Sequence, residues 1–86
     1  MTQNQQFLNQ ITQAIQSCAT TKELTALLKG LLTPPEIEMI ATRIKIVSKL
    51  KHSIPQRIIA EELGVGIATV TRGARELKNG YFASII

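Results

Sequence analysis

The strongest constraint on the fold is a glycine-containing break, Gly64-Val65-Gly66, between two short segments with apolar residues at helical spacing. The apolar residues are Ile58, Ile59 and Leu63 before the break and Ile67, Val70, Ala74 and Leu77 after it. Two helices joined by so short a turn must cross at a steep angle. The pattern therefore predicts a helical corner over residues 56–78.

Two further helices are indicated near the N-terminus. Apolar residues recur at helical spacing from Phe7 to Cys18, whereas residues 1–6 are polar and are expected to fray. Thr20-Thr21-Lys22-Glu23 has the residue types of a capping box, in which the threonine accepts a backbone N–H and the glutamate reaches back. The helix that it starts is expected to end near Gly30.

Threonine and proline mark the start of the longest predicted helix. In Thr33-Pro34-Pro35-Glu36 the threonine is the N-cap and a proline takes the first helical position, and the helix continues to about His52. Ser53-Ile54-Pro55-Gln56 is another capping-box pattern and predicts Ser53 as the next N-cap. Asn79-Gly80 ends the last helix. No segment reads as a strand, so the sequence predicts an all-α fold, a small helical bundle.

The chain is close to the lower size limit for a domain that folds alone. It has 86 residues, of which aromatic residues make up only 3%, so its core must be built from aliphatic side chains. Such side chains lie on two sides of the helix that starts at Pro34. They are Ile37, Ile40, Ala41, Ile44 and Val47 on one side and Met39, Ile46 and Leu50 on the other. This helix is either central to one monomer or shared by two subunits, and the small size favours a homodimer.

The residue inventory excludes most classes of enzyme. The chain has no Asp, one His (His52) and one Cys (Cys18), which rules out Ser-His-Asp chemistry, a His/Cys metal site and an internal disulfide. It also lacks a complete glycine-rich phosphate loop, a secretory signal and an apolar run of the roughly 18 residues that span a membrane. The expectation is a non-enzymatic cytoplasmic protein without a metal or cofactor.

The helical corner has the side chains that a helix-turn-helix requires. Ala60 is small and stands four residues before Gly64, which allows the two helices to approach each other. Apolar residues fill the angle between the helices and close it from the second helix: Ile59, Leu63, Val65 and Val70.

Charge is concentrated in the same half of the chain. Residues 1–38 carry two basic and three acidic side chains, whereas residues 39–86 carry eight basic and three acidic ones. Polar and basic groups project from the corner: Arg57, Thr69, Thr71, Arg72, Arg75 and Lys78. The corner and these charges could serve only structure and solubility, but the combination favours binding to double-stranded DNA, with the second helix in the major groove.

Gly73 is unusual because it lies inside the predicted last helix. Glycine there costs about 1 kcal/mol relative to alanine. It belongs to a stripe with Thr69, Arg72 and Glu76. Either a flat or bulky group approaches the backbone at Gly73, or another helix packs closely against it.

These residues resemble the Trp repressor family, small dimeric bacterial repressors that bind operator DNA when loaded with L-tryptophan as corepressor. The resemblance runs from about Leu32 to Lys78, through LTPPEIEMIATRIKIV, QRIIAEELGVGIATVTRG and LK. It implies an intertwined homodimer. Residues 1–52 would supply the dimerisation helices, 53–79 the helix-turn-helix, and 80–86 a short stub of the usual C-terminal dimer-clasping element.

The resemblance also implies roles for individual residues. Arg43 and Arg72 would flank the indole, with Arg72 pairing the carboxylate, and Val47, Thr69 and Gly73 would line the pocket. Leu32 and Thr33 of a second subunit would close it and meet the ammonium group. Arg57 would reach a guanine edge. The other residues expected at DNA are Gln56, Gly66, Ile67, Ala68, Thr69, Thr71 and Arg72, together with the projecting Arg75 and Lys78.

This sequence also departs from the family pattern. Glu76 stands where a small hydroxyl residue is more usual near the ligand amine, Gly30 replaces a larger apolar residue, and Ala60 replaces a common lysine. We therefore include Glu76 among the candidate ligand-binding residues. Two alternatives stay open, namely a DNA-binding regulator that responds to another ligand or to none, and a helical oligomerisation or adaptor module that does not bind DNA.

Overall fold

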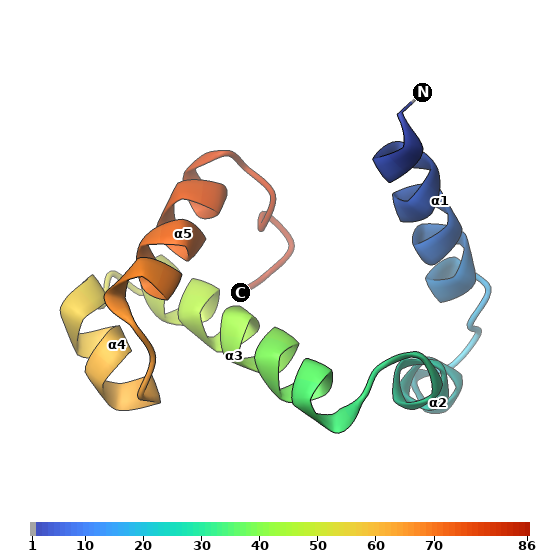
Figure 1. The fold of residues 1–86 in the computed structure, drawn as a ribbon, viewed down its shortest axis with the longest axis horizontal. Coiled ribbons are helices and arrows are strands. Elements are labelled where there is room, and N and C mark those ends of the chain that lie inside the picture. Colours follow the sequence, from blue (N-terminus) through green and yellow to red (C-terminus); the bar gives the residue numbers. More distant parts are fainter. Residues whose placement is uncertain (1) are drawn as a thin grey trace. The chain divides into compact units, whose positions relative to one another are not determined.

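The computed structural model describes residues 2–86, which form five α-helices and no strand (Figure 1). The helices are α1 (Gln3–Gln16), α2 (Thr21–Leu31), α3 (Pro34–Lys51), α4 (Gln56–Leu63) and α5 (Ile67–Lys78). The predicted all-α fold is confirmed. Within the described residues, no helix combines the length and the hydropathy that crossing a membrane would require. The chain divides into two compact units, Met1–Ile37 and Glu38–Ile86, which are described separately.

In the first unit, α1 begins earlier than the sequence predicts. Residues 1–6 were expected to fray, but the helix starts at Gln3, and of this range Met1 alone lies outside the described residues. The reason is an N-cap: the Thr2 hydroxyl accepts a hydrogen bond from the Gln5 backbone N–H at 3.2 Å. The Gln5 side chain in turn donates to Asn9 one turn further on, at 3.1 Å.

Apolar side chains of the first unit have little cover. Neither α1 nor α2 contains a buried residue. Phe7 is 51% exposed and Leu31 is 59% exposed. Exposed apolar area on this scale is unfavourable in water.

Both predicted threonine caps are present. At the start of α2, the Glu23 N–H donates to the Thr20 hydroxyl at 3.1 Å, and the Glu23 carboxylate accepts from the Ala19 N–H at 2.7 Å. At the start of α3, the Glu36 carboxylate accepts from the Thr33 N–H and from the Thr33 hydroxyl, each at 2.9 Å. These two hydrogen bonds stabilise the charged form and lower the pKa of Glu36.

In the second unit, the prediction that Ser53 is the N-cap of α4 is wrong. Ser53 has a left-handed backbone, with φ 61°, and its N–H donates to the Leu50 carbonyl, while the Ile54 N–H donates to the Lys49 carbonyl. These bonds form a Schellman motif that ends α3. The N-cap of α4 is Pro55, which has no side-chain oxygen to offer. Ser53 therefore terminates one helix instead of starting the next.

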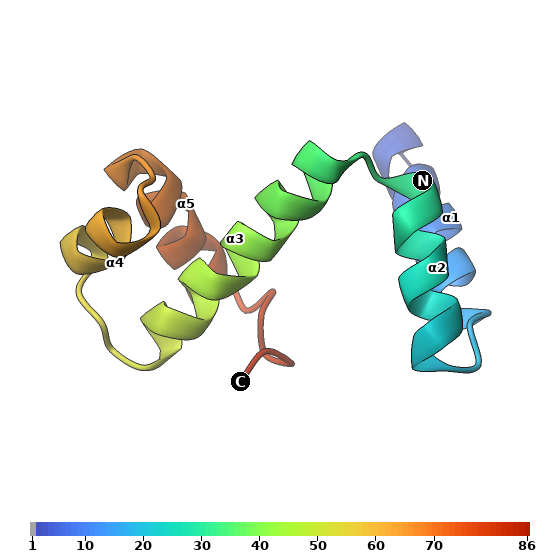
Figure 2. The ribbon, with the colours of Figure 1, turned by 90° about the horizontal axis from the view of Figure 1, so that it is seen from below.

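The helix-turn-helix core forms as predicted, with α4 and α5 meeting at the end of α3 (Figure 2). Ile46, Ile59 and Val70 are buried together, one from each of the three helices. Leu50, Ile54, Ala60, Leu63 and Val65 pack around them. Gly64 ends α4 with a left-handed backbone, which glycine adopts without steric cost.

Ile67 is the one residue of the predicted core stripe that is exposed, since Val70 is buried and Ala74 and Leu77 are half-buried. Ile67 is 52% exposed, whereas Val70, one turn later, is fully buried. Ile67 is the first residue of α5 and follows the turn at Gly66, so it lies beyond the apolar cluster. Its position at the exposed start of the helix is compatible with the other role predicted for it, a contact with DNA.

Candidate functional site

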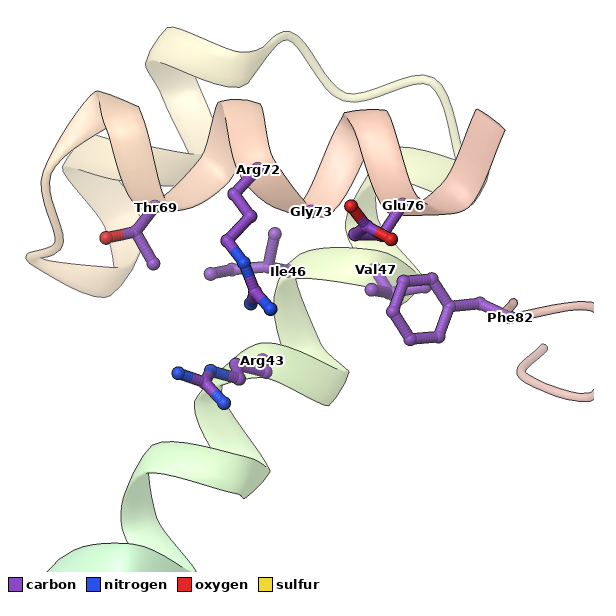
Figure 3. A pocket seen from close by; sticks show the side chains of 8 residues that line it. All are labelled: Arg43, Ile46, Val47, Thr69, Arg72, Gly73, Glu76 and Phe82. Carbon is purple, nitrogen blue, oxygen red and sulfur yellow. The ribbon is translucent and has the colours of Figure 1, made fainter. Parts of the chain in front are cut away.

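A pocket of about 130 Å³ lies between α3, α5 and the segment that follows α5 (Figure 3). From α3 it is lined by Arg43, Ile46 and Val47; from α5 by Thr69, Arg72, Gly73 and Glu76; and from the last segment by Phe82. All eight residues belong to the second unit. The pocket therefore belongs to a single compact part of the chain.

The two arginines of the pocket come from different helices. Arg72 extends from α5 towards α3, and Arg43 extends from α3 into the same region (Figure 3). Neither has an ion pair with a carboxylate at 4.0 Å or less among the interactions of the described residues. Two neighbouring guanidinium groups favour an anion, and a planar carboxylate matches the paired donors of arginine.

A different chemistry is found at the other end of the pocket. Glu76, Val47 and Phe82 lie together there (Figure 3). The Glu76 carboxylate is 3.6 Å from Nε of its neighbour Arg75, at the outer edge of the helix. The pocket thus combines two cations, one anion and an apolar wall, which are the groups needed to hold an amino acid by its carboxylate, ammonium and side chain. Across residues 2–86 no cluster of His, Cys, Asp and Glu is suited to a metal ion.

Gly73 contributes to the pocket because it has no side chain. A Cβ at this position would lie 3.0 Å from Cγ2 of Ile46 and 3.7 Å from Cδ1 of Leu50. Close helix packing is thus one reason for this glycine. The residue also lines the pocket, and the approach of a flat or bulky group to its backbone stays a prediction.

The structure brings together six of the eight residues predicted to bind the ligand, namely Arg43, Val47, Thr69, Arg72, Gly73 and Glu76. Leu32 and Thr33, which were predicted to come from a second subunit, lie in the first unit around the start of α3. Sequence reasoning missed Ile46 and Phe82. Ile46 follows Arg43 by about one helical turn and so lies on the same face of the helix, a signal that could have predicted it as a pocket residue. No local pattern predicts Phe82.

Residues predicted to contact DNA lie on α4, on α5 and in the turn between them. Gln56 is half-buried. The others are exposed, namely Arg57, Gly66, Ile67, Ala68, Thr69, Thr71, Arg72, Arg75 and Lys78. The Thr71 hydroxyl donates to Oε1 of Gln56 at 2.9 Å, which links the two helices at this face. Thr69 and Arg72 belong both to this face and to the pocket.

Comparisons with known proteins point to one family. The family model for Trp repressor protein matches residues 6–83. A Trp operon repressor homolog of Vibrio parahaemolyticus is 44% identical over 71 residues, which cover 81% of this chain and 69% of that protein. Its namesake in Vibrio cholerae is 43% identical over 76 residues, covering 87% and 70%. That of Photobacterium profundum is 41% identical over 71 residues, covering 81% and 69%.

The match includes α3, the corner, the pocket and almost all of the remaining described chain. It agrees with the resemblance found in the sequence motifs. The chain therefore belongs to the Trp repressor family, a family of transcription regulators rather than of enzymes.

Proposed function

We propose that this protein is a homodimeric transcriptional repressor that binds operator DNA when L-tryptophan occupies the pocket between α3 and α5. The observation that carries the proposal is that α5 contributes residues both to the pocket and to the predicted DNA-binding face. Thr69 and Arg72 line the pocket and are also exposed on the helix that carries the DNA-facing residues. A ligand held there contacts the element that must enter the major groove.

Each group of L-tryptophan has a candidate partner. Arg72, with Arg43 beside it, pairs with the carboxylate, and Val47, Thr69 and Gly73 receive the indole. Glu76 attracts the ammonium group. The ligand contacts both α3 and α5 and so favours the orientation of α5 that fits the major groove. Because the ligand binds this conformation more tightly than others, it raises the population of the DNA-binding state.

The pocket of one chain, about 130 Å³, is partly open to solvent and is not a closed cavity. We propose that Leu32 and Thr33 of a second copy complete it. Residues 1–52 then provide dimerisation, and the exposed apolar side chains of α1 and α2 supply the surface that a second copy would cover.

Residues 53–79 act as the DNA-binding part of the protein, which works in the cytoplasm on double-stranded DNA. Arg57 reaches a base edge, while Gln56, Gly66, Ile67, Ala68 and Thr71 approach bases, waters and phosphates. Arg75 and Lys78 add positive charge for the DNA backbone. The affinity for DNA is accordingly expected to fall as the salt concentration is raised.

Ligand binding is tested by titrating L-tryptophan into the protein by calorimetry. The chain contains no Trp, so the fluorescence of the ligand can be followed in the same sample. We expect saturable binding of one L-tryptophan per subunit and a loss of binding in Arg72→Ala. Lys78→Ala is the matched control, since Lys78 is a cation on α5 that does not line the pocket. Failure of the unmodified protein to bind at millimolar concentration would refute tryptophan as the ligand.

DNA binding is tested by selecting duplexes from a random pool with and without L-tryptophan. We expect enrichment of one sequence only when L-tryptophan is present. Arg57→Ala should weaken binding to that duplex by about 5- to 150-fold and leave L-tryptophan affinity unchanged, whereas Arg72→Ala should weaken both. Equal, ligand-independent losses in the two variants would refute a shared pocket and DNA face.

Glu76 favours a second candidate, a DNA-binding regulator that responds to another ligand or to none. A carboxylate in the pocket repels a ligand carboxylate that comes too close. This candidate predicts enrichment of a duplex without any response to L-tryptophan. A helical adaptor module, by contrast, predicts no enrichment under either condition.

A further inference from the structure

The segment that follows α5 turns back towards α3. Gly80 has a left-handed backbone, with φ 88°, and the Tyr81 N–H donates to the Glu76 carbonyl at the end of α5. The reversal brings Phe82 into the wall of the pocket, beside Val47 (Figure 3). Here we call residues 81–86 the strap.

Two polar side chains of α3 hold the far end of the strap. The Ser48 hydroxyl donates to the Ile86 carbonyl at 3.1 Å, and the Lys51 ammonium group donates to the Ile85 carbonyl. The Ile85 side chain is half-buried. Both anchors lie outside the pocket, and both contact backbone carbonyls, so they hold the strap without depending on its side chains.

We propose that the strap is part of the ligand site, with Phe82 as an aromatic wall that selects a flat ring and with Ser48 and Lys51 as positioning residues. The inference rests on the proposed binding of L-tryptophan in this pocket. Phe82 and Val47 are the apolar side chains at the end of the pocket opposite the two arginines, where the Glu76 carboxylate also lies. An aromatic ring against an aromatic wall gains packing energy beyond the area that it buries, and the flat face of Phe82 is best matched by another flat ring.

Tyr81 provides a matched control. It is the neighbouring aromatic residue of the strap, but it is 74% exposed and does not line the pocket. Calorimetry with L-tryptophan is expected to give a dissociation constant about tenfold higher for Phe82→Ala and an unchanged one for Tyr81→Ala. Phe82→Leu keeps an apolar wall without the ring and should be intermediate. Equal affinities in Phe82→Ala and the unmodified protein would overturn the proposal.

The anchors are tested by removal and rescue. Ser48→Ala combined with Lys51→Met should weaken L-tryptophan binding in the same direction as Phe82→Ala. Ser48→Thr combined with Lys51→Arg keeps a hydroxyl and a cation and should restore it. We call the variant with Ser48→Ala and Lys51→Met the anchor-free variant. Adding Phe82→Ala to it should reduce the affinity for L-tryptophan little further, because the ring of Phe82 has already left the pocket. A full additional loss would show that the anchors do not act through Phe82.

The placement of the strap is measured separately, in the protein without ligand. We expect nuclear Overhauser contacts between the ring protons of Phe82 and the methyl groups of Val47, and their loss in the anchor-free variant. Absence of these contacts in the unmodified protein would overturn the inference. Absence of L-tryptophan binding with these contacts present would refute the proposed ligand and support the placement of the strap.

Discussion

Gly73 on α5 and Ile46 on α3 are so close that a methyl group on Gly73 would lie 3.0 Å from Cγ2 of Ile46. Ile46 is almost completely buried and is packed against Ile59 and Val70, so it cannot easily move aside. This contact sets how closely the two helices approach each other at the pocket. Gly30, the glycine inside α2, differs from Gly73 in this respect, because a Cβ at Gly30 would meet no atom within 4 Å.

Gly73→Ala is expected to destabilise the protein by about 1 kcal/mol, because overpacking of about 1–3 kcal/mol exceeds the gain of about 1 kcal/mol in helix propensity. Gly30→Ala should instead stabilise it by about 0.5–1 kcal/mol. Urea unfolding at one fixed protein concentration measures both. In an Ile46→Leu background, which lacks the Cγ2 methyl, Gly73→Ala should lower the free energy of unfolding by less. An unchanged cost would contradict the role of this contact.

Ser53→Gly is expected to raise the melting temperature. Ser53 has a left-handed backbone at the end of α3, which is unfavourable for a residue with a Cβ, and glycine should relieve about 0.5–1 kcal/mol. For a chain of this size that corresponds to a rise of roughly 2–8 °C. Ser53→Ala keeps the Cβ and is the control. Equal stabilisation by alanine and glycine would show that the hydroxyl, not the backbone, is responsible.

Glu36 is expected to titrate below its ordinary pKa of 4.5, because it accepts hydrogen bonds from the backbone and the hydroxyl of Thr33. A lowered pKa in the folded state means that its stabilising contribution is present above pH 4.5 and is lost as the pH falls through the lowered value. Unfolding measured down the acid range should therefore show a shallower loss of stability in Glu36→Gln.

The same capping box can be tested from its other side. Thr33→Ala removes the hydroxyl bond and keeps the backbone bond, so the pKa of Glu36 should rise part of the way towards 4.5. Thr33→Ser keeps both bonds and should leave it low. Carboxyl resonances followed by NMR give these values directly, and an identical pKa in the alanine and serine variants would contradict the assignment.

Ile59 and Ile67 allow one substitution to be compared at a buried and an exposed site. Ile59 is 0% exposed and Ile67 is 52% exposed. Ile59→Ala should cost about 2–5 kcal/mol, because it leaves a cavity between α3, α4 and α5, whereas Ile67→Ala should cost less than about 1 kcal/mol. Urea unfolding tests the difference. Similar costs at the two sites would contradict the position of Ile67 outside the core.

Local signals in the sequence determined most of the helices. The caps at Thr20 and Thr33 involve side chains and backbone groups three residues apart, so the pattern of residues is enough to predict them. The corner at Gly64 was predictable for the same reason, since a left-handed helix end favours glycine. The motifs around Arg43 and Arg72 were also enough to indicate the family, which the comparisons confirm.

Tertiary structure decided what depends on contacts between distant residues. Ser53 has the residue type of an N-cap, but its backbone conformation is set by hydrogen bonds to the end of α3. Phe82 enters the pocket because the chain reverses at Gly80 and α3 holds the far end of the strap. Such positions follow from packing between elements and not from periodicity along one of them, and the sequence pattern alone therefore did not reveal them.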